Sequence, residues 1–200
     1  MGRGGSRNPS PRRPLIMVFT ILHKTTKYEK MPDYRRYRVK GGIHFFTANL
    51  AERKRKLLTE PIDTFRAVKQ AHPFQMDAVV VLPDHLHTIW TLPEGDDDFS
   101  LRWRQIKSAF SREIEQGERV SKSRARKQER GIWQRRFWEH ALRDESDFAR
   151  HVAYIHFNPV KHGHVASVAD WPHSSFHRYV QLGICPLDWA GEDNEDLDYD

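Results

Sequence analysis

The sequence predicts a single mixed domain in which a β-sheet is packed by helices. A β-rich apolar run over 75–82, a turn at Pro83 and Asp84 and a second run over 85–92 indicate a β-hairpin. Two later segments, over 99–116 and after Asp144, repeat apolar residues at helical spacing. The hydrophobic content of 38% and the six tryptophans are enough for one core in a domain of this length.

Charge divides the chain into three regions. Residues 1–30 carry seven bases and one acid in a Gly-, Pro- and Ser-rich sequence, whereas residues 188–200 carry seven acids and no base. We therefore expect a basic disordered arm over 1–30, a domain over 31–191 and an acidic tail over 192–200. The net charge of +6 suits a polyanionic partner such as nucleic acid, although many soluble domains are equally basic.

Several classes of protein are excluded by composition. The single cysteine, Cys185, excludes a disulfide framework and a multi-thiolate zinc site and suits a reducing cytoplasm. Arg12 and Arg13 precede a short apolar run that lacks a signal-peptide cleavage site. No stretch approaches the roughly 20 apolar residues of a membrane span. We expect a soluble cytoplasmic protein without a membrane partner.

The first half of the domain is predicted to hold three strands and a helix. Residues 39–50 contain G-G-I-H-F-F-T-A-N-L, a strand-like run with a Gly-Gly entry. Apolar residues at three-residue spacing after Pro61 predict an amphipathic helix over about 60–71. After the hairpin, the acidic run 96–98 suits a turn and a helix N-cap better than a calcium loop.

The second half is predicted to hold two helices, a basic loop and a strand. The apolar stripe of the helix over 99–116 consists of Phe99, Trp103, Ile106, Phe110 and Ile114. Residues 119–130 carry six bases and one acid, which is typical of a mobile loop. A strand over 137–142 precedes a helix that Asp144 or Ser146 caps and that Pro159 is expected to end. The remaining residues are expected to be irregular.

His85 and His87 form a His-x-His pair on the second strand of the hairpin. Side chains two residues apart on a strand project from the same face, so both imidazoles can converge on one point while Leu86 faces the core. Two convergent imidazoles make half of a divalent-metal site. The alternative is a pair of satisfied or exposed histidines, which a chain with twelve histidines can contain by chance.

Tyr154 and Asn158 lie one turn apart on the last predicted helix. A helical wheel places both beside the apolar stripe, on the face that also holds His151. A tyrosine next to a metal can attack a phosphodiester, and the amide oxygen of Asn158 can join the two histidines as a ligand. This combination indicates breakage and rejoining of single-stranded DNA. The alternative is an interface aromatic and a C-terminal helix cap.

From residue 31 to residue 191 the chain resembles the REP-associated tyrosine transposases, bacterial relatives of the single-strand insertion-sequence transposases in the HUH superfamily. The matching motifs are Y-R-R-Y-R-V-K-G-G, V-V-L-P-D-H-L-H-T-I-W-T-L-P-E-G-D-D-D-F-S, W-R-Q-I-K, R-F-W-E-H-A-L-R, Y-I-H-F-N-P-V-K-H-G and D-W-P-H-S-S-F-H-R. Several motifs in order are far more specific than one His-x-His pair. The resemblance implies a ferredoxin-like α+β fold, with helices packed on an antiparallel sheet, and the core of an HUH endonuclease.

The resemblance also implies roles for single residues. His85 and His87 match the HUH pair, Tyr154 matches the nucleophile, and Asn158 matches the polar residue that can complete the metal site. Three features depart from the family pattern. His156 stands where a second aromatic residue is often found, the stretch around 118–130 is longer and more basic than usual, and residues 1–30 have no counterpart.

The expected reaction uses Mg²⁺ or Mn²⁺ as a Lewis acid on the scissile phosphate. Attack by Tyr154 would give a 5′-phosphotyrosine and a free 3′-hydroxyl. Because a free tyrosine has a pKa near 10, a neighbour must help to remove its proton, and His151 is a candidate by its helical position. By resemblance, the target is a hairpin-forming repetitive extragenic palindrome (REP) with a single-stranded guide sequence beside its foot.

Single-stranded DNA also requires a basic groove and aromatic stacking surfaces. The candidates are Arg102, Arg104, Arg112, Arg135 and Arg136, interleaved with Trp103, Trp133 and Trp138, some of which are expected in the core. We expect a monomer or weak dimer associated with the bacterial nucleoid. Two alternatives remain: a hairpin-binding regulatory protein with vestigial chemistry, and a histidine-ligated metallohydrolase that uses water and tolerates Tyr154→Phe.

Overall fold

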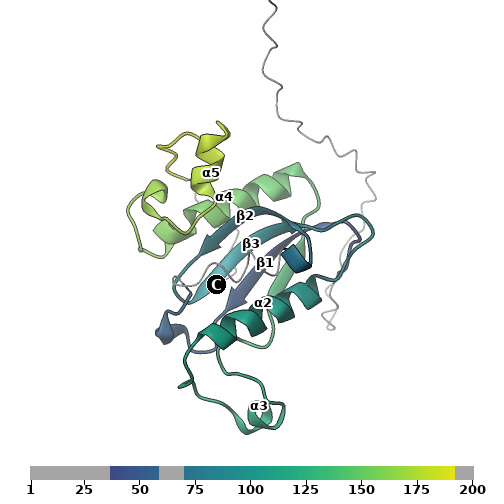
Figure 1. Ribbon diagram of the computed structural model, residues 1–200. Helices are drawn as coiled ribbons and strands as arrows, with labels where there is room; N and C mark the ends of the chain where they lie inside the picture. Colours follow the sequence, from purple (N-terminus) through teal and green to yellow (C-terminus); the bar gives the residue numbers. More distant parts are fainter. Residues whose placement is uncertain (1–36, 59–69, 192–200) are drawn as a thin grey trace, which may run out of the picture. The chain divides into compact units, whose positions relative to one another are not determined.

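The computed structural model describes residues 37–58 and 70–191, which belong to one compact unit of the chain, residues 34–200. The expected arm over 1–30, the acidic tail over 192–200 and most of the expected helix over 60–71 lie outside the described residues. Within them, a four-stranded antiparallel sheet has helices on both faces (Figure 1). No helix in the described part of the chain is long and apolar enough to cross a membrane.

The sheet has the strand order β2-β3-β1-β4. β1 (Ile43–Asn49) and β3 (His85–Thr91) are central, and β2 (Gln75–Val81) and β4 (Trp138–Ala141) are the edges. All neighbouring strands are antiparallel. This order is that of a ferredoxin-like sheet, and it confirms the predicted α+β fold.

The strands lie close to the predicted positions. The predicted hairpin is confirmed, and its turn is closed by a hydrogen bond from the Leu82 N–H to the His85 carbonyl at 2.9 Å. β1 is shorter than predicted at its start. Gly41 has a φ of 65°, a left-handed conformation that a strand does not accommodate, and its N–H donates to the Asp96 carbonyl instead.

Alternation along the central strands produces two separate cores. On one face of the sheet, Phe46, Leu86 and Trp90 pack under α2 (Phe99–Glu113). On the other face, Phe45 and Ile89 pack under α4 (Glu145–Lys161). Because both faces are covered, every residue of β3 except its last is buried.

α2 follows the prediction at its start and ends early. The Asp98 side chain accepts from the Leu101 N–H at 3.0 Å, as the acidic run predicted, and the expected apolar stripe is buried from Phe99 to Phe110. The helix ends at Glu113 because Ile114 adopts an extended conformation. That turn of the backbone lets Ile114 pack against the core beneath α2.

α4 begins as predicted, but the prediction that Pro159 ends it is wrong. The Asp144 side chain accepts from the Asp147 N–H at 2.8 Å. The helix then continues through Pro159 to Lys161, and the His162 N–H still bonds to the Asn158 carbonyl at 3.0 Å. So close to the end of the helix, proline removes one backbone donor and leaves the following hydrogen bonds intact.

The basic segment 119–130 is structured, contrary to the prediction of a mobile loop. It contains the short helix α3 (Lys122–Arg126), and two of its arginines, Arg124 and Arg130, turn inward. The Arg124 guanidinium donates to the carbonyls of Arg130 and Trp133 at 2.6 and 2.8 Å. Arg130 donates to the Ser111 carbonyl at 2.7 Å and forms an ion pair with Glu118. Guanidinium groups that bind main-chain carbonyls replace the missing apolar contacts.

The segment after α4, predicted to be irregular, contains η2 (Val168–Asp170) and α5 (Phe176–Gln181). It runs along the outer edge of β2. The Val81 N–H donates to the His173 carbonyl at 2.9 Å, and the Ser175 N–H donates to the Val79 carbonyl at 2.8 Å. These bonds satisfy an edge strand that would otherwise expose its backbone.

Arg102, predicted to contact DNA, is buried inside the fold with 4% of its surface exposed. Its guanidinium donates to the carbonyls of His72, Pro73 and Asp98 and pairs with the Asp96 carboxylate at 2.7 Å. This arginine therefore joins the start of α2 to the chain that enters β2, and it does not suit a contact with DNA.

We expect Arg102→Ala to lower the free energy of unfolding by about 2–4 kcal/mol, because it leaves a carboxylate and buried carbonyls without their donor. Arg104→Ala is the matched control, since Arg104 is exposed on the same helix and should change stability by less than about 0.5 kcal/mol. Urea unfolding followed by circular dichroism measures both. Equal effects would contradict the structural role of Arg102.

Glu118 should make stability depend on pH. The hydrogen bond from Arg130 lowers the pKa of Glu118 from 4.5 to about 2, and its side chain is 3% exposed. A carboxyl whose folded pKa is lowered stabilises the protein above its unfolded pKa, and that contribution is lost as the pH falls toward the folded value.

We therefore expect Glu118→Gln to be less stable than the wild type at pH 6, by about 3 kcal/mol at most. The difference should shrink between pH 4.5 and 2. Glu115→Gln, at an exposed residue of the same segment, should leave stability nearly unchanged at both ends of this range. Urea unfolding at a series of pH values measures the effect, and a deficit that persists at pH 2 would refute it.

Candidate active site

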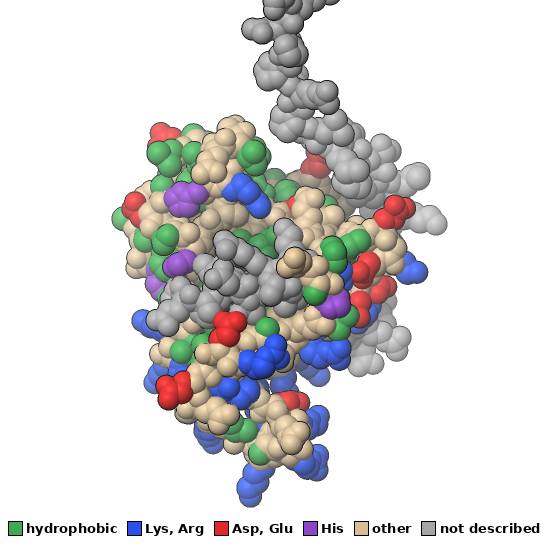
Figure 2. Space-filling model, in the orientation of Figure 1, with side chains coloured by type: hydrophobic (Ala, Val, Ile, Leu, Met, Phe, Trp, Pro, Cys, Tyr) green, Lys and Arg blue, Asp and Glu red, His purple; other side chains and the backbone are tan. Residues whose placement is uncertain are grey.

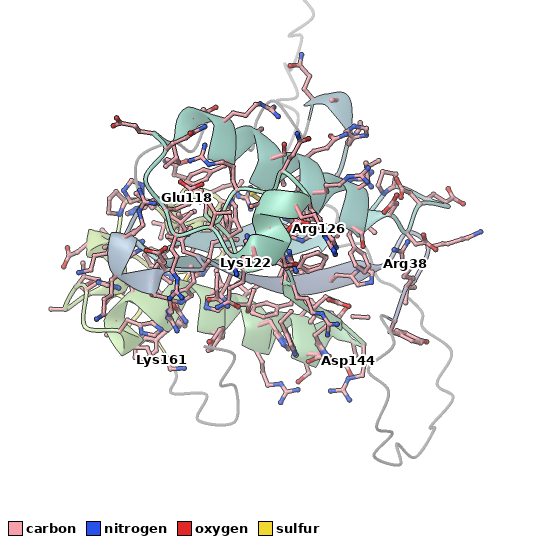
Figure 3. All side chains as sticks on the ribbon, turned by 90° about the horizontal axis from the view of Figure 1, so that it is seen from below. Arg38, Glu118, Lys122, Arg126, Asp144 and Lys161 are labelled. Carbon is pink, nitrogen blue, oxygen red and sulfur yellow. The ribbon has the colours of Figure 1, made fainter. Side chains whose placement is uncertain are left out.

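A row of polar side chains lies between α4 and the sheet. Asp147, His151, Tyr154 and Asn158 follow one another at helical spacing along the face of α4 that covers the sheet, and none is more than 5% exposed. Figure 3 shows α4 along the sheet, with Asp144 and Lys161 at its two ends. The strands beneath add three histidines, His85, His87 and His140. The fold thus collects these groups in one layer.

His85 and His87 project together from β3, as the alternation predicted. Their ring centroids lie 5.0 Å apart, whereas Leu86 packs in the opposite core. The His85 ring also contacts the His162 ring at 5.1 Å, so an imidazole from the end of α4 borders the pair. The two histidines of β3 therefore lie on one face of the sheet, close enough to each other to contact the same ligand.

Each of these two histidines is oriented through its Nδ1 atom. The Nδ1 of His85 lies 2.7 Å from a carboxylate oxygen of Asp84, and the Nδ1 of His87 lies 2.8 Å from the Thr47 hydroxyl. A carboxylate oxygen accepts, so the His85 Nδ1 carries the proton and the lone pair of that ring is on Nε2; the Thr47 hydroxyl is able to accept from His87 in the same way. Such outer partners commonly fix the tautomer of metal-binding histidines.

Arg53 of η1 (Arg53–Arg55) in turn holds Asp84, with its Nε 2.5 Å from Oδ2. Burial raises the pKa of Asp84, but hydrogen bonds from Arg53 and His85 outweigh burial, and the pKa is lowered from its usual value. Asp84 is therefore a carboxylate at neutral pH and a steady acceptor for the imidazole.

Tyr154 packs directly against this pair. Its ring centroid lies 5.1 Å from that of His87 and 6.0 Å from that of Phe45. The ammonium of Lys161 lies 5.1 Å from the Tyr154 ring centroid. Contacts with the sheet and with Lys161 explain why Tyr154 is only 5% exposed, less than its position beside the apolar stripe predicted.

Asn158 lies one helical turn after Tyr154 and is fully buried. Neither its Oδ1 nor its Nδ2 has a hydrogen-bond partner among the described residues. A buried amide without partners is costly, so its presence here requires an explanation. An amide oxygen and imidazole nitrogens are ligand types that suit a divalent cation.

A second group of metal-ligand type lies nearer the start of α4. Nitrogen or oxygen atoms of His140, Asp147 and His151 lie within 4.8 Å of one another, so this cluster could hold a metal ion. Burial raises the pKa of Asp147, but hydrogen bonds from His140 and Arg143 outweigh it and the pKa is lowered. His140 and Asp147 were not among the residues predicted for the site. The four-residue spacing of Asp147 and His151 was a usable signal, whereas His140 joins them only through the fold.

His151 belongs to this cluster. Its Nδ1 donates to the Asp147 carbonyl at 2.7 Å, and its ring stacks on His140 with centroids 5.2 Å apart. Phe45 contacts His151 at 4.8 Å and His87 at 5.6 Å, so its ring lies between the two groups of histidines. Burial lowers the pKa of His151, which keeps its imidazole neutral at pH 7.

The structure separates the predicted DNA contacts. Arg104 and Arg112 are exposed on α2, which covers the face of the sheet opposite Tyr154. Arg135 pairs with Glu129 at 2.8 Å, and Arg136 is exposed beside it. Arg135 and Arg136 come directly after Gln134, whose N–H donates to the Asn49 carbonyl at the end of β1.

The three tryptophans predicted as stacking surfaces differ in exposure. Trp103 and Trp133 are core residues with 1% and 4% of their surface exposed, whereas Trp138 is 36% exposed on the edge strand β4. Of the three candidate stacking surfaces, the structure therefore leaves Trp138 accessible.

The known proteins that this chain is similar to are tyrosine transposases. A REP-associated tyrosine transposase of Escherichia coli is 51% identical over 166 residues, covering 81% of this chain and 93% of that protein. A Haemophilus influenzae protein that carries the same family name is 48% identical over 172 residues, covering 84% and 97%. No family model matches the chain.

A solved structure supports the same assignment. It is a REP-associated tyrosine transposase bound to a REP hairpin, 51% identical, with a TM-score of 0.68 over 81% of this chain and 93% of that chain. At this identity and coverage the family is established. The chain belongs to the REP-associated tyrosine transposases.

The buried Asn158 amide, which has no hydrogen-bond partner among the described residues, leads to a prediction about stability. We expect Asn158→Leu, measured in a chelator, to leave the free energy of unfolding unchanged or raise it by about 1 kcal/mol, because an apolar side chain of similar size removes a buried, unsatisfied amide.

Ser175→Ala is the contrasting variant, because the Ser175 hydroxyl accepts from the Val79 N–H at 3.0 Å and lies 2.9 Å from the His156 Nε2. It should cost about 1–2 kcal/mol. Urea unfolding measures both variants. A loss of more than about 2 kcal/mol for Asn158→Leu would mean that the amide has a stabilising partner in the folded protein.

Proposed function

We propose that this protein is a metal-dependent single-strand DNA endonuclease and transposase. It cleaves and rejoins DNA at hairpin-forming repetitive extragenic palindromes through a 5′-phosphotyrosine intermediate. The observation that carries the proposal is the contact between the Tyr154 ring and the His87 ring, at 5.1 Å, beneath a helix that also carries Asn158. A nucleophile of this type has little use in a binding protein.

His85, His87 and Asn158 would hold Mg²⁺ or Mn²⁺. With Nδ1 directed to Asp84 in His85 and to Thr47 in His87, Nε2 would be the metal-binding nitrogen of each ring, and the buried Asn158 oxygen would supply a further ligand. When bound, such an ion acts as a Lewis acid toward the phosphate. Asp84 and Thr47 keep the two imidazoles oriented, and the histidine–aspartate cluster at the start of α4 is a second place where a cation could bind.

Tyr154 supplies the nucleophilic oxygen. Its bond to phosphorus forms as the bond from phosphorus to the 3′-oxygen breaks, and the leaving 3′-oxygen takes a proton to become a hydroxyl. The covalent intermediate conserves the bond energy, so that another 3′-hydroxyl can displace the tyrosine and rejoin the strand. This sequence needs no nucleotide cofactor.

The phenol proton needs an acceptor, and the Lys161 ammonium lies 5.1 Å from the centre of the same ring. His151 lies one turn before Tyr154, and with Nδ1–H donated to a carbonyl its Nε2 carries the lone pair. Its lowered pKa keeps it in the neutral form that accepts a proton.

The DNA partner is proposed from the solved relative, which is bound to a REP hairpin. Arg104, Arg112, Arg135 and Arg136 remain candidate phosphate contacts because all four are exposed. We propose that the protein acts as a monomer or weak dimer on the nucleoid, in the bacterial cytoplasm.

An adduct assay tests the proposal directly. The full chain is mixed with labelled single-stranded hairpins taken from the flanks of its own gene, Mn²⁺ is added, and the products are separated on a denaturing gel. We expect a slow covalent band with the wild type and none with Tyr154→Phe, because phenylalanine has no nucleophilic oxygen. His85→Ala combined with His87→Ala should reduce the band at least a hundredfold, since ligand loss removes charge stabilisation worth several kcal/mol.

Two other outcomes have defined meanings. Tight binding of hairpins without an adduct would remove the transposase proposal and leave a regulatory DNA-binding protein. Cleavage without an adduct, retained in Tyr154→Phe, would indicate a metallohydrolase that uses water.

A further inference from the structure

The α3 segment, residues 118–130, is more ordered than a solvated basic loop needs to be. Arg124 and Arg130 are turned inward onto carbonyl groups, and Gly131 lies where an added Cβ would come within 2.5 Å of the Arg119 carbonyl oxygen. Ser121 caps α3 by accepting from the Arg124 N–H. The segment is thus a preformed protrusion whose shape is set by its own arginines.

A different set of cations faces solvent. Arg119, Lys122, Arg126 and Lys127 are exposed, and none has an acidic partner among the described residues. No acid occurs from residue 119 to residue 128, and the flanking acids Glu118 and Glu129 are neutralised by Arg130 and Arg135. Figure 2 shows Lys and Arg side chains gathered on this protrusion at the bottom of the view.

Hydrogen bonds join the protrusion to the histidine end of the sheet. At the end of β1, the Leu50 N–H donates to the Asp84 carbonyl, and the next N–H, of Ala51, donates to the Ile132 carbonyl. The segment that precedes His85 and the segment that follows α3 therefore flank the same two residues. Figure 3 shows α3, with Lys122 and Arg126, in front of the sheet.

η1 forms a second link between the two regions. Its Arg53 holds Asp84, which orients His85. On the other side, the Glu52 carboxylate accepts from the Arg119 N–H at 2.9 Å, and Arg55 lies 3.9 Å from the carboxylate of Glu118. The exposed cations of α3 are therefore held at a fixed position relative to the candidate metal ligands.

We propose that the α3 segment is a clamp for double-stranded DNA, which holds the duplex stem of the hairpin substrate through its phosphates. This inference rests on the proposed function and adds the part of the substrate that this surface recognises. Single-strand sites combine charge with aromatic stacking, but residues 115–131 contain no aromatic side chain. A fixed array of Lys and Arg without stacking groups suits a backbone of fixed phosphate spacing and carries no base specificity.

The test compares two DNA ligands and two variants of the full chain. Lys122→Gln, Arg126→Gln and Lys127→Gln are combined in a charge-removing variant, and Lys122→Arg, Arg126→Lys and Lys127→Arg in a charge-retaining one. Both carry Tyr154→Phe, so that binding is measured without covalent reaction. The ligands are a labelled hairpin with its guide strand and an unpaired oligonucleotide of equal length, each titrated by fluorescence anisotropy at several salt concentrations.

The charge-removing variant should bind the hairpin at least tenfold more weakly at 0.1 M salt, and the slope of log K against log salt should flatten by about 2–3, since duplex contacts contribute roughly 0.9 each. Its affinity for the unpaired strand should change less than about twofold. The charge-retaining variant should behave as the parent, because phosphate contacts require charge rather than side-chain shape. Circular dichroism should show both variants folded, since all three side chains are exposed.

Three outcomes would overturn the clamp. Equal weakening for hairpin and unpaired strand would mean a general electrostatic effect, and unchanged hairpin binding would leave an acidic protein as the partner of this surface. If the charge-retaining variant bound the hairpin as weakly as the charge-removing one, the positive charge of these side chains would not be the cause of hairpin binding. The proposed function fails separately, in the adduct assay, because the anisotropy measurement requires no cleavage.

Discussion

The register between β1 and β3 is the constraint on which the candidate site depends. Asn49 pairs with His85 and Thr47 pairs with His87, so both histidines face α4 while Leu86 and Trp90 face α2. Because side chains alternate along a strand, a slip of one residue would put the imidazoles in the apolar core beneath α2 and turn Leu86, Thr88 and Trp90 toward α4. Burial on both faces makes that exchange unfavourable, so the packing that stabilises the sheet also holds His85 and His87 on the face covered by α4.

A polar row within a packed layer has consequences for stability. Asp84, Thr47 and Asp147 form hydrogen bonds of 2.7 to 3.1 Å with neighbouring histidines, so these groups are held at little cost. Asn158 differs, because its buried amide has no partner among the described residues. Residues that reduce stability without an evident compensating contact are expected where function requires them. The histidines are held through one ring nitrogen each, whereas neither polar atom of this asparagine has a hydrogen-bond partner among the described residues, and this contrast is the clearest sign of a site beneath α4.

Several arginines stabilise the fold from within instead of facing solvent. Arg102, Arg124 and Arg130 each donate several hydrogen bonds to main-chain carbonyls, and each fixes a segment that has few apolar residues of its own. A guanidinium can do this because its five N–H donors are held in a fixed planar geometry. Arginine content therefore does not measure DNA-binding charge in this protein. The cations that face solvent on α3 are different residues from the ones that hold the segment in place.

The family resemblance of the sequence implied the α+β class. The residue patterns by themselves determined the hairpin, the shared face of His85 and His87 and the helical relation of Tyr154 to Asn158. These features follow from periods of two and about 3.6 residues and from capping groups three residues away, all of which act over a few positions of the chain. Only the tertiary structure decided that Arg102 is buried, that His140 joins Asp147 and His151, and that Thr47 orients His87. Each of these depends on atoms contributed by segments distant in sequence, and a local pattern carries no information about which distant carbonyl, hydroxyl or ring the fold will bring within hydrogen-bonding distance.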